Sequence, residues 1–200
     1  MTDAKEHKKR MQETQAKHKA KVKEATDPER ALVLVHTGDG KGKSSSAFGV
    51  IIRALGWGKR VGVVQFIKGK WITGERQFFE KLDQPIIWHT MGDGFTWDTQ
   101  DAEQDTKAAV AAFDLATEMM NSGEFDLIVL DEINIALRYD YLDVNVVIDA
   151  LEARADHTSV ILTGRDAKPE LMDYADLVSE MVERKHPYQS GIKAQRGIDY

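Results

Sequence analysis

Residues 37–45, Thr-Gly-Asp-Gly-Lys-Gly-Lys-Ser-Ser, are of the types that bind a chain of phosphate groups. Glycines let backbone N–H groups approach phosphate oxygens because no Cβ stands in the way. Lys43 supplies a positive charge for those oxygens, and the Ser44 hydroxyl is a ligand for Mg²⁺. The strict phosphate-loop motif has glycine where Thr37 stands, and Gly38 comes one residue later. A ligand-free glycine turn is the alternative, but the lysine and hydroxyls favour phosphate binding.

Two carboxylates follow a second apolar run, in which Leu127–Leu130 leads directly to Asp131 and Glu132. A hard oxygen ligand close to bound phosphates is what Mg²⁺ requires. The alternative is that the acidic pair interacts with the start of the next helix. Because a phosphate-binding loop lies upstream, we favour a metal-binding role.

Two large aromatic residues, Phe95 and Trp97, lie in the glycine-containing loop 91–98. The acidic residues Asp93 and Asp98 beside them indicate that the loop meets solvent. Aromatic side chains in such a loop can form a flat surface for a ligand. The alternative is that both rings fold back onto the core.

Apolar, partly β-branched runs alternate along the chain with segments of helical character. The runs predict strands over 31–36, 59–66, 85–90, 125–130, 158–163 and 177–182. The other segments predict helices over 44–55, 73–82, 99–120, 143–155 and 169–174. Such alternation predicts an α/β fold with a parallel sheet covered by helices on both faces. Ligands of these sheets bind at the carboxyl ends of the strands, so four residues are expected at one edge: Thr37, His89, Asp131 and Gly164.

The chain divides into an N-terminal arm, residues 1–29, and a single α/β domain, residues 30–200. Residues 1–30 hold nine Lys or Arg against six Asp or Glu, whereas the whole chain has a net charge of −6. The arm is either a solvated segment or a helix that closes over the site when ligand binds. The acidic domain argues against non-specific nucleic-acid binding, which requires Lys and Arg to neutralise phosphates.

The amino-acid composition limits the kinds of bond and metal site that are possible and indicates a cellular location. The 200 residues include no cysteine, which excludes disulfides and thiolate metal sites. Because no apolar run reaches the length of a membrane span and no secretory signal is visible, we expect a cytoplasmic protein without membrane contact. The six histidines lack metal-ligand spacing. His36 adjoins the phosphate loop, and the sequence does not fix its role.

Five stretches together resemble the corrinoid (cobalamin) adenosyltransferases of the phosphate-loop type: residues 37–45, 63–69, 91–97, 130–132 and 191–200. The resemblance covers nearly the whole chain and includes threonine at position 37. It departs at Ser44 and Ser45, where threonines are common in the family, although the hydroxyls are kept. It implies a P-loop NTPase-like (RecA-like) single domain. It also implies an enzyme that transfers the 5′-deoxyadenosyl group of ATP to cobalt(I) of a corrinoid and releases triphosphate.

The resemblance also implies site residues. The expected ATP contacts are Thr37, Gly38, Asp39, Gly40, Lys41, Gly42, Lys43, Ser44 and Ser45. Mg²⁺ or Mn²⁺ is expected on Ser44 and Glu132. Phe95 and Trp97 are expected on the lower face of the corrin, where they displace the lower nitrogen ligand of cobalt. Lys43, Phe95 and Trp97 are the residues expected to act in catalysis.

Partners follow from the same resemblance, namely a second copy of the chain in a homodimer and a reduced, flavodoxin-like flavoprotein as electron donor. The alternatives are an ATP hydrolase or motor and an ATP-sensing module. The aromatic residues at 95 and 97 argue against both, since neither function needs them. The sequence does not identify the physiological corrinoid or the reductase.

Overall fold

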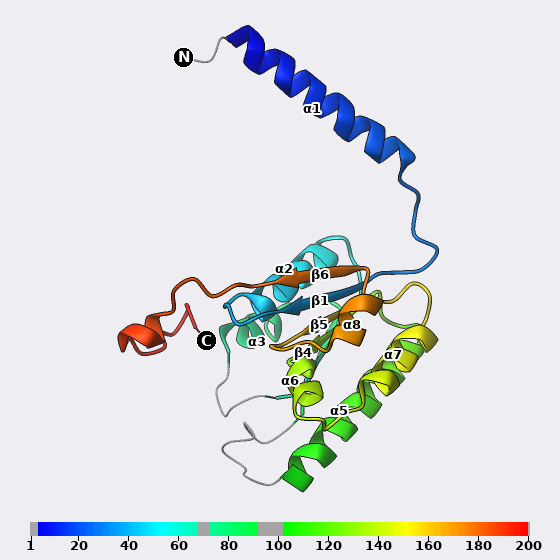
Figure 1. Cartoon of the computed structure of the whole chain (residues 1–200). Helices are drawn as coiled ribbons and strands as arrows, with labels where there is room; N and C mark the ends of the chain where they lie inside the picture. The colour runs from blue at the N-terminus through cyan, green and yellow to red at the C-terminus, as the bar shows by residue number, and fades with distance from the viewer. Residues whose placement is uncertain (1–3, 68–72, 92–101, 200) are drawn as a thin grey trace.

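The computed structural model describes residues 4–67, 73–91 and 102–199, and these contain one six-stranded sheet (Figure 1). Every strand pairing in it is parallel, and the strand order is β3-β2-β4-β5-β1-β6. The strands are β1 (Val33–Thr37), β2 (Val61–Gln65), β3 (Ile86–Thr90), β4 (Leu127–Asp131), β5 (Ser159–Thr163) and β6 (Leu177–Glu180). The predicted parallel α/β sheet is confirmed.

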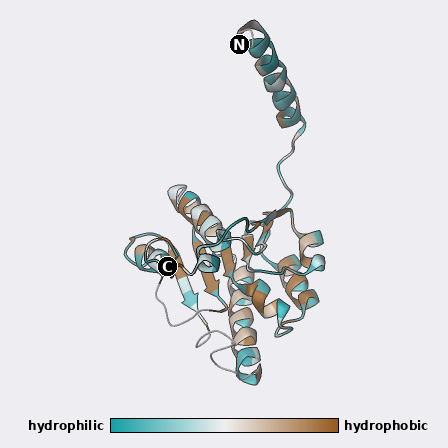
Figure 2. Ribbon diagram, turned by 60° about the vertical axis from the view of Figure 1, so that its left-hand side comes forward, coloured by the Kyte–Doolittle hydropathy of each residue, from teal (hydrophilic) through white to brown (hydrophobic). Residues whose placement is uncertain are grey.

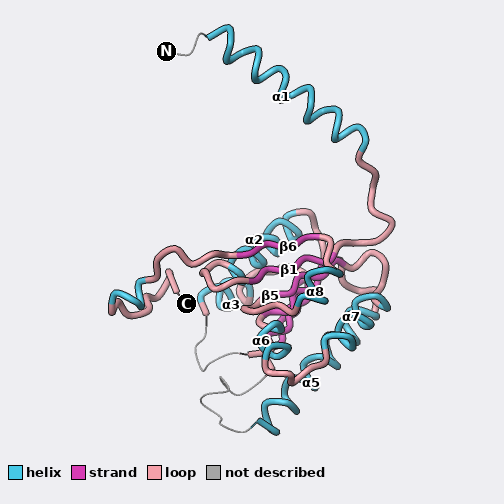
Figure 3. The backbone as a smooth tube through the Cα atoms, viewed as in Figure 1, coloured by secondary structure: helices cyan, strands magenta, loops and turns pink. Residues whose placement is uncertain are grey.

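Helices cover both faces of the sheet (Figure 3). One face carries α2 (Lys43–Gly56) and α3 (Gly74–Phe79). The other carries α5 (Ala102–Asn121), α6 (Ile133–Arg138), α7 (Val144–Ala153) and α8 (Pro169–Tyr174). Two apolar clusters result, one on each side of the sheet. Such burial on both sides explains why the strands read as continuous apolar runs, drawn brown in Figure 2.

Successive side chains of β1 point to opposite faces, as the period of a strand requires. Val33 and Val35 pack in the cluster that contains α5 to α8. Leu34 packs in the cluster that contains α2. His36, two residues further on, therefore faces the start of α2, which matters for the site described below.

The strand register brings the carboxyl ends of the strands together at one edge. Gln65 lies beside both Thr90 and Asp131, and His36 lies beside Thr163. Gly164 donates its N–H to the carbonyl of His36 at 3.2 Å. The expectation that the ends of β1, β3, β4 and β5 share one edge is confirmed.

Two short elements were not among the predicted ones, α6 and the 3₁₀ helix Pro187–Ser190. Helix α6 begins immediately after the acidic pair at the end of β4. Its buried residues Ile133, Ala136 and Leu137 follow the spacing of one helix face, which is the signal that could have revealed it. Helix α3 is shorter than the predicted span 73–82.

The arm contains a 21-residue helix, α1 (Ala4–Glu24), that stands away from the sheet in Figure 1. Its side chains from residue 6 to residue 24 are all exposed, and Figure 2 shows it as almost wholly hydrophilic. Ala, Lys, Gln and Glu have high helix propensity, so the helix forms locally without a buried face.

Because α1 has no buried face, deletion of residues 1–26 should leave the stability of the α/β domain nearly unchanged. We expect the melting temperature measured by circular dichroism to change by less than about 2 °C, the shift that corresponds to under 1 kcal/mol in a chain of this size. A drop of about 10 °C or more would mean that the arm is part of the folded core.

Candidate functional site

The loop between β1 and α2 owes its shape to glycines. Gly38 and Gly42 have φ angles of 94° and 114°, in the left-handed region where side chains are strained. A Cβ on Gly38 or Gly40 would lie 2.5 or 2.8 Å from the carbonyl oxygen of Met181. The Gly40 N–H donates to that same oxygen at 2.6 Å. The chain just beyond β6 therefore packs directly against the loop. This close packing requires glycine at positions 38 and 40 whether or not the loop binds phosphate.

Lys43 is the first residue of α2, and its side chain is buried. Its ammonium donates to the carbonyl of Gly40 at 2.8 Å, so the charge rests inside the loop. Burial lowers the pKa of Lys43, and the nearby Arg165 guanidinium acts in the same direction. The carboxylates of Glu132 and Asp39 oppose that shift in pKa.

The hydroxyl residues of the loop differ in their environment. Thr37 is buried, and its Oγ1 accepts the N–H of Ala167 at 3.1 Å, so this threonine joins β1 to the loop after β5. Ser44 is half-buried on the first turn of α2, whereas Ser45 is exposed. Of these three hydroxyls, that of Ser44 combines partial shelter with a place at the helix start.

Residues from two distant segments reach the outer side of the loop. Lys41 forms an ion pair with Asp199 of the C-terminal tail, and that pair lowers the pKa of Asp199. The exposed Arg165 donates from Nη2 to the carbonyl of Asp39 at 3.2 Å. These contacts bring the segments after β5 and β6 to the phosphate loop.

Asp131, at the end of β4, is a buried carboxylate with a partner on each oxygen. Its Oδ2 accepts from Gln65 Nε2 at 2.9 Å, and its Oδ1 accepts from Thr163 Oγ1 at 2.8 Å. The Gln65 amide is held in turn by Trp88 Nε1 and Thr90 Oγ1, which donate to Oε1 at 2.9 and 3.2 Å. The ends of β2, β3, β4 and β5 are thus joined by side-chain hydrogen bonds.

Glu132 differs from its neighbour in having a carboxylate oxygen with no partner. Its backbone lies in the left-handed region at φ 63°, and its N–H donates to Thr163 Oγ1 at 2.9 Å. Oε2 is buried and accepts no hydrogen bond within the described structure. Burial, aided by the charge of Asp131, raises the pKa of Glu132 to about 7, although Lys43 and Arg165 act against that rise. A buried carboxylate oxygen with no hydrogen-bond donor suits a cation that arrives with a ligand.

The structure therefore places the predicted phosphate loop and the predicted acidic pair at the same sheet edge. The predicted aromatic residues Phe95 and Trp97 lie outside the described residues. Gln65 and Thr163 were missed by the sequence reasoning. A polar residue at the end of an otherwise apolar strand was the available signal for both.

The sequence of the chain matches a known protein family over most of its length. The model of the family described as ATP:corrinoid adenosyltransferase BtuR/CobO/CobP matches residues 29–200. The chain belongs to this family. That stretch contains the phosphate loop, the acidic pair and the C-terminal tail.

Curated corrinoid adenosyltransferases are similar to the chain over nearly its full length. The protein from Pseudomonas aeruginosa is 46% identical over 194 residues, covering 97% of this chain and 95% of its own. The protein from Sinorhizobium sp. is 47% identical over 190 residues, covering 92% and 89%. Corrinoid adenosyltransferase CobA from Salmonella typhimurium is 45% identical over 191 residues, covering 96% of each chain. The chain is accordingly an enzyme of the adenosyltransferase class, and neither the hydrolase nor the sensing module is favoured.

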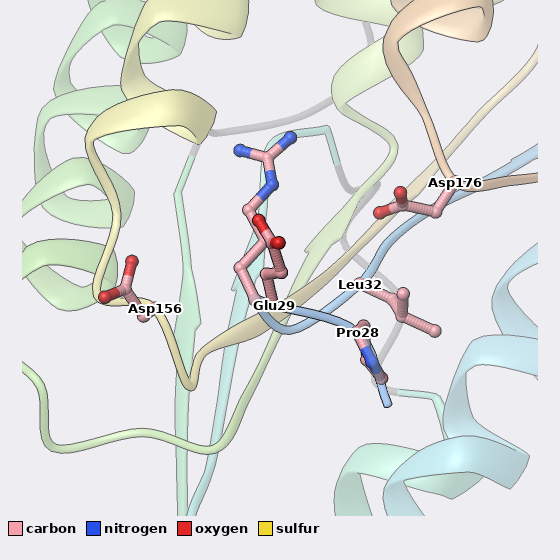
Figure 4. Close-up of a pocket in the computed structure, with 6 residues that line it drawn as sticks. Pro28, Glu29, Leu32, Asp156 and Asp176 are labelled. Atoms are coloured by element: carbon pink, nitrogen blue, oxygen red, sulfur yellow. The ribbon is translucent and has the colours of Figure 1, made fainter. Parts of the chain in front are cut away.

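A hollow of about 500 Å³ lies at the opposite edge of the sheet, where β1, β5 and β6 begin (Figure 4). It is lined by Pro28, Glu29, Arg30, Leu32, Asp156 and Asp176. Arg30 donates to the Tyr174 hydroxyl at 3.0 Å, and Asp176 accepts the N–H of Val33 at 2.8 Å. These contacts anchor the chain where it enters β1 and give the Arg30 and Asp176 side chains a structural role.

The raised pKa of Glu132 predicts how pH affects stability in the metal-free enzyme. A folded-state pKa of about 7, above the ordinary 4.5, gives stability that is present below pH 4.5 and lost as pH rises through 7. Glu132→Gln stays neutral, so its melting temperature should rise relative to wild type by several degrees between pH 5 and pH 8.5. Thermal melts in a chelator at both pH values measure this gap.

Glu118→Gln is the matched control, because Glu118 is an exposed residue of α5. Its gap from wild type should not change with pH. If the difference in melting temperature between Glu132→Gln and wild type is equally independent of pH, the Glu132 carboxyl ionises as a solvated group.

Proposed function

We propose that the chain transfers the 5′-deoxyadenosyl group of ATP to cobalt(I) of a corrinoid and releases triphosphate. The observation that carries this proposal is the family match, which spans every described residue of the candidate site. In the reaction a cobalt–carbon bond forms at the 5′ carbon while the bond from that carbon to the triphosphate oxygen breaks. The electron pair of the broken bond leaves on triphosphate, and no proton has to be removed from cobalt(I).

The phosphate loop would stabilise the negative charge that grows on triphosphate as it leaves. Residues 37–45 would surround the phosphates, with Lys43 as the main positive charge and the first N–H groups of α2 as donors. The proposal is supported by the burial of Lys43 at the start of α2, where its ammonium needs only to exchange the Gly40 carbonyl for a phosphate oxygen. A charge held in place before the reaction costs little rearrangement during it.

Ser44 and Glu132 fit a divalent cation, Mg²⁺ or Mn²⁺, that accompanies ATP. Among the residues that the structure describes, no three His, Asp or Glu side chains form a ready-made metal site, so phosphate oxygens would have to complete one. The unpartnered Oε2 of Glu132 supports this choice, whereas both oxygens of Asp131 already accept hydrogen bonds. When bound, the ion would neutralise phosphate charge.

Phe95 and Trp97 would bind the lower face of the corrin and displace the lower nitrogen ligand of cobalt. This part of the proposal rests on the resemblance of residues 91–97 to the family. It is supported by the direction of the chain, since β3 ends at Thr90 beside Gln65, on the same edge as the phosphate loop. The chain therefore leaves β3, at Met91, from the edge of the sheet that carries the candidate site.

The wider setting is proposed on the same resemblance: a cytoplasmic homodimer that takes electrons from a reduced, flavodoxin-like flavoprotein, with no nucleic-acid or membrane partner. No helix of the described chain is both long and apolar enough to cross a membrane. The N-terminal arm would close over the bound corrinoid. Its exposed helix supports this role, because α1 packs on no part of the domain as it stands.

Replacement of Lys43 tests the role of the phosphate loop. Lys43→Met keeps the buried aliphatic stem but removes the charge, so adenosyl transfer should fall by about 100-fold or more, as for loss of one preorganised donor. Turnover of ATP and chemically reduced cob(I)alamin measures the loss. Lys107→Met, on the exposed surface of α5, is the control and should retain activity. Near-normal turnover of Lys43→Met would remove the lysine from the mechanism.

Replacement of both aromatic residues tests the corrin-binding loop. Phe95→Ala with Trp97→Ala should greatly reduce adenosylation that starts from cob(II)alamin and a weak reductant. Activity from pre-formed cob(I)alamin should survive far better, because that nucleophile needs no lower ligand displaced. Equal losses from the two starting states would mean that the rings only shape the binding surface.

A further inference from the structure

His36 lies beneath the first turn of α2 and is buried. Its Nδ1 is 2.8 Å from the hydroxyl of Ser46 and 3.4 Å from the carbonyl oxygen of Lys43. The same Ser46 hydroxyl donates to the Lys43 carbonyl at 2.8 Å. Three polar groups from the end of β1 and the start of α2 thus form a closed triangle.

The protons of this triangle can be assigned by counting donors. The Lys43 carbonyl can only accept, and the Ser46 hydroxyl has one proton, which it gives to that carbonyl. A proton on His36 Nδ1 completes this arrangement, because the ring can then donate to both the hydroxyl and the carbonyl, and we assign the ring proton to Nδ1 on that ground. In the opposite tautomer, the unprotonated Nδ1 would lie 3.4 Å from the carbonyl oxygen of Lys43. Burial lowers the pKa of His36, which favours the neutral form of the ring.

The start of α2 needs such support because it lacks an ordinary cap. The residue at the N-cap is Gly42, which has no side chain to accept from the first N–H groups. A capping side chain would occupy the donors that a phosphate group requires. His36 and Ser46 instead hold the first turn of α2 through the carbonyl of Lys43. The N–H groups of that turn therefore stay available to a phosphate group.

We propose that His36, acting through Ser46, is the positioning residue that holds Lys43 and the first turn of α2 in the geometry that binds triphosphate. This inference rests on the proposed function, since it deepens the role given to the phosphate loop. His36 touches neither substrate in this account. Its effect passes through the backbone of Lys43.

Amide substitutions at position 36 distinguish the effect of the proton on Nδ1 from the effect of the size of the ring. His36→Asn places an N–H near the position of Nδ1, whereas His36→Gln places its amide nearer that of Nε2. We expect KM for ATP to rise about three- to tenfold in His36→Gln and in Ser46→Ala, as for loss of one buried neutral hydrogen bond. His36→Asn should stay within about twofold of wild type, because the donor is restored. KM for the corrinoid should not change in any of them.

Two further measurements distinguish positioning from general damage. The double variant His36→Gln with Ser46→Ala should lose no more ATP affinity than either single variant, since the triangle acts as one unit. The ¹⁵N spectrum of the wild-type enzyme, assigned by the signal missing in His36→Asn, should show a protonated Nδ1 and a bare Nε2. If substitutions at position 36 prevent folding, KM for ATP in Ser46→Ala still decides the matter, and an unchanged value overturns the proposal.

The proposal is overturned if His36→Gln matches His36→Asn, if the single losses add in the double variant, or if the ring proton is on Nε2. These results differ from a failure of the proposed function. If the proposed function fails, the wild-type enzyme itself forms no cobalt–carbon product from Mg²⁺, ATP and cob(I)alamin.

Discussion

The site depends on one buried negative charge, the Asp131 carboxylate at the end of β4. Hydrogen bonds from Gln65 and Thr163 hold its two oxygens, and each such bond to a charged group contributes about 1.5–3 kcal/mol. That is a large part of the roughly 5–15 kcal/mol by which a domain is stable. Because these partners come from β2 and β5, satisfying the charge aligns the ends of neighbouring strands. It also leaves Glu132 as the carboxylate with a free buried oxygen.

The loop that we propose binds triphosphate is shaped before any ligand arrives. Met181 exchanges backbone hydrogen bonds with Thr37 and Gly40, at 2.8 and 2.6 Å, so the chain leaving β6 supports the loop from below. On the opposite side, His36 and Ser46 hold the first turn of α2. A loop fixed on two sides can bind a highly charged leaving group with little loss of conformational freedom, which is the general advantage of preorganisation.

The sequence predicted the parts of this structure that depend on local pattern. The parallel sheet, the phosphate loop after β1 and the acidic pair after β4 follow from runs and spacings that a single chain displays. The sequence did not predict why Gly40 must be glycine, because the atom that a Cβ would meet belongs to Met181, far along the chain. Nor did it reveal that Asp131 and Glu132 differ. That difference arises from Gln65 and Thr163 on other strands and from the left-handed backbone of Glu132.

In the proposed reaction, cobalt(I) attacks the 5′ carbon of ATP and not a phosphorus atom. The most direct measurement is an anaerobic reaction of the enzyme with Mg²⁺, ATP and chemically reduced cob(I)alamin. It is followed by the absorbance of the cobalt–carbon product and by ³¹P spectroscopy of the phosphorus products. We expect one triphosphate for each adenosylated corrinoid, with ADP and orthophosphate only at background. ADP and orthophosphate without a cobalt–carbon bond would contradict it and indicate a hydrolase.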